Sequence, residues 1–534
     1  MPYQICHAEY AGKCAGYNTL MSTRNERLVI GCVVLVFILM ITLPYLYAAQ
    51  AGDDAYVFGG FLLNPIDGNS YLAKMYEGWK GDVKFTLPYT AEVSEGGYLF
   101  LLYIGLGHLA RIIDVHRMLL FHAARISSSL VMLASLHRFL RYTVVDRHVR
   151  LAAFTITVIG GGMGWVGLIF GLFTSDFWVA EAYPFLSSYA NPHFPLGLAL
   201  LLYLFTFPKE GNSLRSVDWW KIVVVSFVLG LLMPFGVVLV LAVLLGLSIW
   251  ELYPRFSNFR DSYTVRRGFW IFLGGVPVLL YDLWVINQDP LLSIWNRQNL
   301  TPSPSLVDLL LSLSPILILA IFGIPEVFRT KESGLRLLLV WSLVGLLLLY
   351  FPWELQRRFM IGIFIPLCAL AASGLNKIAK STRAFTFLTT LLIVLIIPTN
   401  IIVLLASLQG AAKHDDRLYL TNGEIQAYQW IEINTAPDSI ILASPDSGLL
   451  IPGYTGRRVI YGHPFETANA DDELEQVKSF FVGDINLTNA LLNRADYLFL
   501  GPRERGLGSV HNLDQLPVVY ESPDVTIYRA HIDP

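Results

Sequence analysis

The chain has 534 residues, of which 54% are hydrophobic and only 15% are charged, and its mean hydropathy is +0.53. Soluble globular proteins carry about a quarter charged residues, so this composition excludes a soluble globule and predicts a polytopic membrane protein. The formal net charge of −3 excludes the basic stripe of a nucleic-acid-binding protein. The cysteines have neither metal-ligand spacing nor the pattern of a disulfide framework, and we expect them to be packing residues or bystanders. They are Cys6, Cys14, Cys32 and Cys368.

Residues 1–27 are polar, and we predict that they form a cytoplasmic tail. The first hydrophobic run covers Leu28–Tyr47 and is followed by Ala49-Gln-Ala51, which resembles a signal-peptidase site. The run is longer than the apolar core of about 7–15 residues in a signal peptide. We therefore expect a retained membrane helix, with a cleaved signal peptide as the alternative.

A polar, acidic stretch, Asp67–Asp82, follows within a loop that we predict over residues 48–97. Its apolar positions draw one stripe along a short helix, and such a helix lies on a membrane surface rather than across it. The stripe consists of Tyr71, Leu72, Met75, Tyr76 and Trp79.

Further hydrophobic runs predict about 11–12 membrane helices between residues 28 and 410. Lys and Arg cluster in short loops, which the positive-inside rule places in the cytoplasm. This topology needs residues 220–250 to reverse at Met233-Pro234 as a tight hairpin; the alternative is one kinked helix. It also leaves one of the two helices in 98–137 short of a full crossing. The clusters are Arg24/Arg27, Arg138–Arg150, Lys209/Arg215, Arg255–Arg267, Arg329–Arg336 and Lys377–Arg383.

The tail, residues 411–534, alternates short β-rich runs with helical segments near 423–434 and 471–482, which predicts a small α/β domain on the outer side of the membrane. Its Gly462–Thr467 segment is a compact polar turn that either contacts an acceptor or caps a strand. Loops of modest length and a single tail domain favour a bacterial plasma membrane. The β-rich runs are Ser439–Ser444, Arg458–Gly462, Ala495–Leu500, Val518–Glu521 and Val525–Arg529.

Gly160–Gly164 lies inside a hydrophobic run, and we interpret it as a site of close helix packing.

Asp67 is the strongest candidate for chemistry. A carboxylate at the membrane–water interface can stay ionised and accept a proton from an acceptor hydroxyl or amine. The alternative is a solvated helix cap, since Asp is a favoured N-cap residue.

Arg357 and Arg358 precede a membrane run at its predicted outer edge. Guanidinium groups suit the phosphate oxygens of a polyprenyl phosphate. The alternative is that both side chains extend to lipid headgroups.

Two further outer loops carry polar residues. Asp176, Glu181 and His193 could hold a divalent ion such as Mg or Mn, or form ordinary surface. In the loop 287–305, Trp295 and Gln298 could stack on a sugar or belong to a lid, whereas Trp295 could equally be a membrane-interface residue.

The order of these features resembles a known family. A first span, then Asp67-x-x-x-Tyr71-x-x-x-Met75-x-x-Gly78-x-x-Gly81-Asp82, then Glu92-Val-Ser-Glu95 before a hydrophobic helix, resembles the first outer loop of the GT-C superfamily of membrane glycosyltransferases. Protein O-mannosyltransferases, lipid A aminoarabinose transferases and RgtA-B-C-D-like families belong to that superfamily. Ala124-Arg125-Ile-Ser-Ser128 is similar to an Arg-Leu-x-Ser helix start in those enzymes. The likeness covers 28–140 best, and extends by topology to about 410.

The resemblance implies an enzyme that moves a sugar from a polyprenyl-phosphate donor to a lipid, glycan or protein acceptor on the outer face of the membrane, by direct displacement with inversion. Two other classes stay open: a transporter or flippase of lipid-linked sugars, and a non-catalytic envelope assembly factor or sensor. The expected catalytic residues are Asp67, with Asp54 (or its neighbour Asp53) as fallback, and Glu181. The expected substrate-binding residues are Arg357, Arg358, His193, Asp176, Glu95, Tyr71, Trp295 and Gln298.

Overall fold

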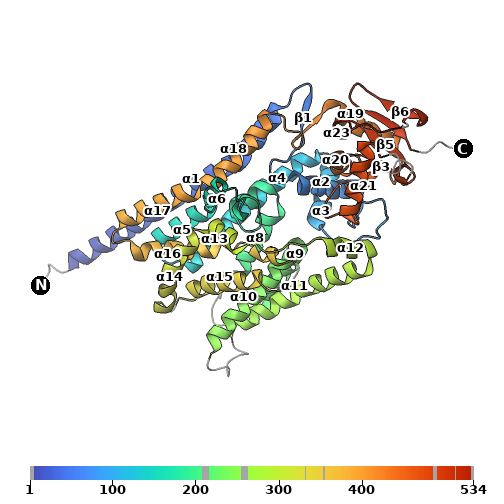
Figure 1. Ribbon diagram of the computed structural model, residues 1–534. Coiled ribbons are helices and arrows are strands. Elements are labelled where there is room, and N and C mark those ends of the chain that lie inside the picture. The colour runs from blue at the N-terminus through green and yellow to red at the C-terminus, as the bar shows by residue number, and fades with distance from the viewer. Residues whose placement is uncertain are drawn as a thin grey trace.

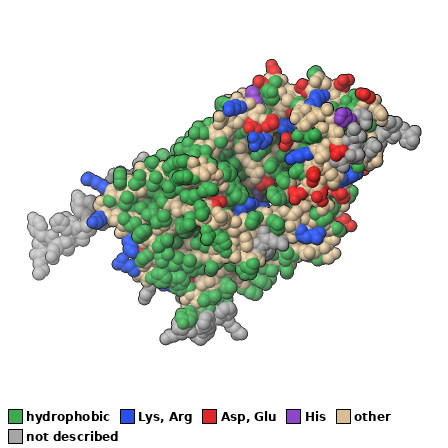
Figure 2. Space-filling model, viewed as in Figure 1, with side chains coloured by type: hydrophobic (Ala, Val, Ile, Leu, Met, Phe, Trp, Pro, Cys, Tyr) green, Lys and Arg blue, Asp and Glu red, His purple; other side chains and the backbone are tan. Residues whose placement is uncertain are grey.

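A bundle of apolar helices forms most of the molecule, and a small sheet with its own helices sits at one end (Figure 1). This computed structural model describes residues 5–206, 216–253, 262–330, 332–352, 355–484, 490–511 and 513–530. Hydrophobic side chains cover the bundle, and acidic side chains gather at the end that holds the sheet (Figure 2). Some of the predicted cytoplasmic cations lie outside the described residues, namely Lys209, Arg215, Arg255, Arg260 and Lys331.

The described part of the chain contains 5 helices that are long and apolar enough to cross a membrane, or up to 6 if one bent pair is a single span. Shorter apolar helices accompany them, so the expected helical, multi-pass membrane fold is confirmed. The spanning segments are Glu26–Ala51 of α1 (Ile5–Ala51), α4 (Arg117–Thr143), α10 (Pro234–Leu252), α11 (Tyr263–Gln288) and Thr382–Ala412, which comprises α17 (Thr382–Ile396) and α18 (Pro398–Ala412); the bent pair is α13 (Leu306–Leu313) and α14 (Ile316–Arg329). The shorter ones are α3 (Leu101–Ile113), α8 (His193–Phe205), α9 (Ser216–Leu232), α15 (Ser333–Leu349) and α16 (Phe364–Ile378).

The predicted hairpin in 220–250 is present. Val223 of α9 lies against Gly274 of α11, while Val237 of α10 lies against the adjacent Gly275. In one continuous helix, residues 14 positions apart (237 − 223) would be separated by about 21 Å. The chain therefore reverses at Met233, between α9 and α10.

Residues 98–137 contain one long and one short helix. The 27 residues of α4 suffice for a span, whereas the 13 residues of α3 extend only about 20 Å, less than the hydrocarbon core of about 30 Å. The helix that does not cross is therefore α3, which packs against α2 (Pro65–Lys80).

The prediction of close helix packing at Gly160–Gly164 holds for the close approach, since a Cβ on Gly162 would lie 1.9 Å from the Ser312 carbonyl oxygen of α13, but most of the segment is not itself helical. The helix α5 (Arg147–Ile159) ends there, and α6 (Gly164–Ile169) begins after a break. Within the break, the backbone N–H groups of Gly162 and Gly164 donate to Asp176 Oδ2 at 3.1 and 2.9 Å. The helix break thus leaves two backbone N–H groups free to bind a buried carboxylate.

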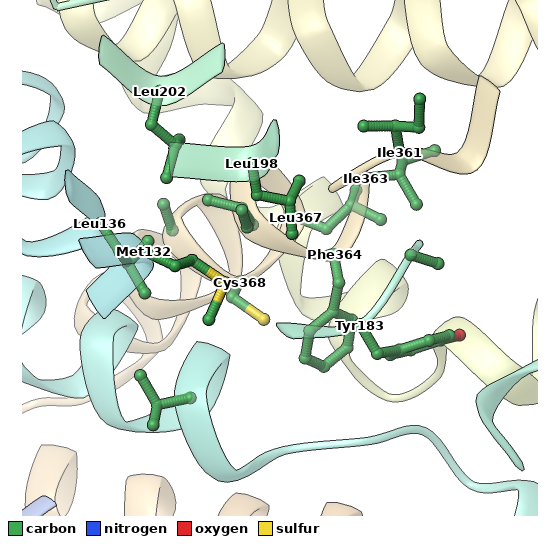
Figure 3. Packing of buried hydrophobic residues seen from close by; sticks show 14 of the residues in the cluster. Met132, Leu136, Tyr183, Leu198, Leu202, Ile361, Ile363, Phe364, Leu367 and Cys368 are labelled. Carbon is green, nitrogen blue, oxygen red and sulfur yellow. The ribbon is translucent and has the colours of Figure 1, made fainter. Parts of the chain in front are cut away.

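The centre of the bundle is a close-packed apolar core in which α4, α8 and α16 meet (Figure 3). The free thiol of Cys368 is fully buried among these side chains, as expected of a packing residue. The labelled side chains in Figure 3 include Met132, Leu136, Leu198, Leu202, Phe364 and Leu367.

The C-terminal α/β domain, Tyr419–Arg529, contains a five-stranded sheet in the order β4-β3-β5-β7-β6. All five strands coincide with predicted β-rich runs, and both predicted helices are present. The pairs β3–β4 and β3–β5 are parallel, and β5–β7 and β6–β7 are antiparallel. The elements are β3 (Ile440–Leu442), β4 (Arg458–Val459), β5 (Tyr497–Leu500), β6 (Val518–Glu521), β7 (Thr526–Arg529), α19 (Asn422–Asn434) and α21 (Ala470–Val482).

Among the elements of this domain that were not predicted, two contact the first loop. The strand β2 (Tyr419–Thr421) pairs antiparallel with β1 (Tyr56–Phe58) of the first loop. The helix α20 (Pro445–Thr455) contains Gly448, Pro452 and Gly453, which interrupt a helical pattern. Both elements join the C-terminal domain to the loop at residues 48–97.

The expectation that α2 lies on a membrane surface is wrong. The helix packs between α3 and α20, and most of its residues from Gly68 to Gly78 are buried. Gly78 lets the backbone of α3 approach, because a Cβ there would lie 2.0 Å from the Ile104 carbonyl oxygen. The stripe of apolar residues is real, but part of it packs on protein far along the chain: Gly453 of α20 lies against Leu72, and Gly456 at its end lies against Tyr76.

Glu77 of α2 predicts a pH-dependent stability. Burial raises the pKa of its carboxyl to about 8, against hydrogen bonds from Thr86 and the charge of Lys74. The folded state thus keeps a proton that the unfolded state releases above its ordinary pKa of 4.5, so the free energy of unfolding should fall as pH rises from 4.5 to about 8. Thermal unfolding of Glu77→Gln should show a flatter dependence across this window. Exposed Glu475→Gln is the control; equal slopes in Glu77→Gln and wild type would contradict the prediction.

Candidate functional site

A cavity of about 280 Å³ opens between the start of α2, the bundle and the C-terminal domain. Its walls come from segments far apart in the sequence, and charged and aromatic side chains face it. The cavity is lined by Leu63, Asn64, Ile66, Asp67, Gly68, Tyr71, Trp178, Ala180, Glu181, Ala190, Asn191, Phe194, Asn299, Thr301, Arg357, Arg358, Pro464 and Phe465.

Asp67 lies in the first turn of α2 and faces this cavity. The N-cap of the helix is Asn64, at φ 50, and not Asp67. The Asn64 amide nitrogen donates to Asp67 Oδ2 at 2.6 Å, and the Asp67 N–H donates back to Asn64 Oδ1 at 3.4 Å. The helix N-terminus favours a negative charge here, while the Asp67 side chain remains 43% exposed.

The surroundings of Asp67 hold its carboxyl ionised. Burial acts to raise the pKa, but the neighbouring His463, Arg358 and Lys74 outweigh burial and bring it below its ordinary value. At neutral pH the group is therefore a carboxylate that can accept a proton.

An arginine pair faces the same cavity. Arg357 and Arg358 lie on η3 (Gln356–Met360), with Arg357 Nε and Arg358 Nη1 at 3.9 and 3.7 Å from Glu181 Oε1. The Arg357 guanidinium also stands 4.6 Å from the centre of the Trp178 ring. These separations are too long for hydrogen bonds, so one carboxylate balances two cations loosely.

Several buried polar atoms around the cavity have no hydrogen-bond partner among the described residues. They are Glu181 Oε1, Arg357 Nε, Thr301 Oγ1 and His463 Nε2. Buried polar groups are nearly always paired in folded proteins, so these unpaired atoms are available to a polar ligand.

Aromatic residues form the wall beside Asp67. Tyr71 stacks on Tyr103 with 4.2 Å between ring centres, and the Tyr103 hydroxyl bonds His193 Nδ1 at 2.6 Å. Burial, followed by the charge of Asp67, raises the pKa of Tyr71 well above its ordinary value, so its hydroxyl stays neutral. Tyr71 lines the cavity, and His193 lies behind it.

Asp176 is separate from the cavity. Besides the two glycine amides, its carboxylate accepts the Thr174 hydroxyl at 2.6 Å, and the side chain is fully buried. The expected ion-binding set of Asp176, Glu181 and His193 is therefore not assembled. Within the described ranges, no three His, Cys, Asp or Glu side chains are grouped so that they could hold a metal ion.

Four other expected residues also lie off the cavity. Asp54 is exposed, and its backbone carbonyl accepts the Asn422 side chain. The Glu95 N–H donates to Asp289 Oδ2 at 2.9 Å, while its own side chain is exposed. Trp295 of α12 (Pro290–Gln298) packs beside Phe85 and Phe100, and Gln298 donates to backbone carbonyls of the C-terminal domain.

The C-terminal turn Gly462–Thr467 supplies cavity residues that the sequence left open. Pro464 and Phe465 line the cavity, and His463 Nε2 lies 3.8 Å from Asp67 Oδ1. The turn is anchored by Glu466, whose Oε1 accepts the Lys74 ammonium at 2.7 Å. The polar composition of the turn was a signal of function in the sequence. Only the packing of the turn on α2 shows that it lies beside Asp67.

Arg125 of the predicted Ala124–Ser128 helix start instead lies within α4. Its guanidinium donates to the carbonyls of Ile41 and Ser188 at 3.0 and 2.8 Å, and so joins α4 to α1 and α7 (Pro184–Ala190). In this chain, the Arg125 side chain holds helices together and lies away from the cavity.

The chain is similar in structure to an oligosaccharyltransferase of Archaeoglobus fulgidus tethered with an acceptor peptide containing the NVT sequon, with 12% identity, 89% of this chain and 69% of that chain covered, and a TM-score of 0.53. The archaeal oligosaccharyltransferase AglB of A. fulgidus, in complex with an inhibitory peptide and a dolichol-phosphate, gives 12% identity, coverage of 90% and 70%, and a TM-score of 0.54. ArnT of Cupriavidus metallidurans, bound to undecaprenyl phosphate, gives 10% identity, coverage of 92% of this chain and 98% of that chain, and a TM-score of 0.49. No protein-family model and no curated protein matches the sequence.

The structural neighbours are GT-C glycosyltransferases, and the similarity to the A. fulgidus enzyme confirms the fold that the first-loop resemblance implied. At 12% identity the similarity concerns the fold.

The buried Lys74–Glu466 pair predicts a large loss of stability when it is broken. Lys74→Met leaves the Glu466 carboxylate buried without its cation, which costs about 3–5 kcal/mol. The thermal midpoint of the purified full-length protein should fall by several degrees, whereas Lys80→Met, at an exposed position of the same helix, should leave it unchanged. Equal midpoints for both variants would show that the pair does not hold the C-terminal domain.

Proposed function

We propose that the chain is a membrane glycosyltransferase that takes a sugar from a polyprenyl-phosphate donor and transfers it to a lipid, glycan or protein acceptor at the outer face of the membrane. One observation carries this proposal: an ionised carboxylate, Asp67, and a guanidinium pair, Arg357 and Arg358, line one cavity. A proton acceptor and a phosphate-binding group are the two charges that such a transfer requires on the protein.

The reaction is a single displacement at the anomeric carbon of the sugar. The acceptor oxygen or nitrogen forms the new bond to that carbon and loses its proton to Asp67. The bond from the carbon to the phosphate oxygen breaks with its electron pair, and polyprenyl phosphate leaves with one more negative charge. Arg357 and Arg358 stabilise that growing charge more than the ground state, which lowers the barrier.

The remaining cavity residues support binding. Glu181 keeps the two guanidinium groups at the cavity wall, and Tyr71 and Trp178 present aromatic faces to which a sugar ring or an apolar chain can bind. AglB, with the same fold, is described in complex with a dolichol-phosphate. A lipid phosphate in the cavity of this chain agrees with that complex.

A divalent ion carried by the donor phosphate would have Glu181 as its cavity ligand. Mg²⁺ is commonly held by one or two carboxylates together with substrate phosphates, and Glu181 Oε1 lacks a hydrogen-bond partner among the described residues. An ion bound there would supply positive charge at the donor phosphate. The A. fulgidus oligosaccharyltransferase is described in complex with Zn and sulfate. Measuring turnover with a chelator, and then with added Mg²⁺ or Mn²⁺, in wild type and Glu181→Gln tests this role.

The test of the proposed function is an assay of the purified protein with a panel of polyprenyl-phosphate sugars and mixed acceptors, with released polyprenyl phosphate as the readout. Asp67→Asn should lower kcat by about 10²-fold or more, because it removes the base. Arg358→Ala should lower kcat/KM for the donor, because the phosphate loses a charged partner.

Two matched controls accompany the assay. Asp54→Asn changes an exposed carboxylate of the same loop, and Arg329→Ala an exposed guanidinium, with a side chain 73% exposed, at the end of α14; both should retain wild-type turnover. Full turnover in Asp67→Asn would overturn the proposal. Movement of intact donor across vesicles without sugar cleavage would favour a flippase.

A further inference from the structure

We infer that His463 of the C-terminal α/β domain is a positioning residue for Asp67, so that the site is complete only when this domain is docked. The inference rests on the proposed role of Asp67 as the base. His463 Nε2 points at Asp67 Oδ1 from 3.8 Å, across the boundary between the domain and α2.

The hydrogen bonds of the turn fix which ring nitrogen of His463 carries the proton. Nδ1 accepts the backbone N–H groups of Phe465 and Glu466 at 3.1 and 3.2 Å. A backbone amide can only donate, so Nδ1 is unprotonated and the neutral ring carries its proton on Nε2. The group aimed at Asp67 is therefore an N–H donor.

This donor is available for Asp67 and a bound ligand. His463 is 2% exposed, and its Nε2 has no hydrogen-bond partner within the described residues. At 3.8 Å the contact with Asp67 is longer than a hydrogen bond, and a movement of less than about 1 Å would form one. Catalytic hydrogen bonds commonly tighten in this way when substrate binds.

The turn that carries His463 is held from three sides. Thr467 Oγ1 accepts the N–H groups of Gly462 and His463 within the turn. Glu466 binds Lys74 and Ser70 of α2, and Gln298 of α12 donates to the carbonyls of Phe465 and Thr467. The position of the imidazole relative to Asp67 is thus set by how the domain docks onto α2 and α12.

The two oxygens of Asp67 then have separate partners. Asn64 holds Oδ2, and His463 faces Oδ1, so a hydrogen bond from His463 would fix the carboxylate plane from its second side. The other groups that act on its charge are Arg358 and Lys74, both cationic, and the neutral hydroxyl of Tyr71. Among all the groups that act on the Asp67 carboxylate, His463 is the one that the C-terminal domain supplies.

The test compares full-length wild type with His463→Phe and His463→Gln in the donor assay. His463→Phe should lower kcat about tenfold, the worth of a hydrogen bond to a charged group, with little change in KM for the donor. The acid limb of its kcat/KM profile should move to higher pH, because Asp67 loses a donor that favours its ionised form. His463→Gln keeps a side-chain N–H and should recover part of both effects.

His511→Phe, at an exposed histidine of the same domain, is the control and should behave as wild type. An unchanged kcat and pH profile in His463→Phe, with Asp67→Asn inactive, would overturn the inference and leave the proposed function standing. A lowered thermal midpoint with an unmoved acid limb would also overturn it, because it would show a purely structural role. Full turnover in Asp67→Asn would instead remove the proposed function itself.

Discussion

The ammonium of Lys74 is fully buried in α2 and is neutralised by Glu466, a residue 392 positions later in the chain. The ring centres of Phe85 and Phe100 lie 4.8 and 4.4 Å from that ammonium. The rings occupy space where water would otherwise hydrate the charge, so the carboxylate is its main neutralising partner. Separating the C-terminal domain from α2 would break this buried ion pair and leave Lys74 without the carboxylate that neutralises it. The first loop and the tail are therefore bound together by an interaction that neither can satisfy alone.

The position of the cavity follows from that docking. The Gly462–Thr467 turn closes one side of the space in front of Asp67, while η3 and Glu181 form another side from within the bundle. Two carboxylates and two guanidinium groups face a small volume, and most of their strong hydrogen bonds are unmade. Because these charged groups are only loosely paired with one another, they are available to bind a phosphate and to stabilise a developing charge.

The sequence identified the charged residues more readily than their surroundings. Asp67 and the arginine pair stand out because charge is costly near apolar membrane runs, and the structure brings both to one cavity. Asp176 carries the same kind of charge, but its carboxylate serves the backbone amides of a helix break, and local sequence does not distinguish the two uses. The apolar stripe of α2 predicted a packed face, and could not reveal that α20, far along the chain, lies against Leu72 and Tyr76 of that stripe. His463 was hidden for the same reason: its neighbour is set by tertiary docking.

The most direct test of the central claim is an experimental structure of the full-length protein with polyprenyl phosphate bound. The account predicts the phosphate group within hydrogen-bond distance of Arg357 and Arg358, with Asp67 facing it across the cavity and the isoprenoid chain leading away toward the bundle. A phosphate bound elsewhere, with these three side chains facing an empty cavity, would contradict the account.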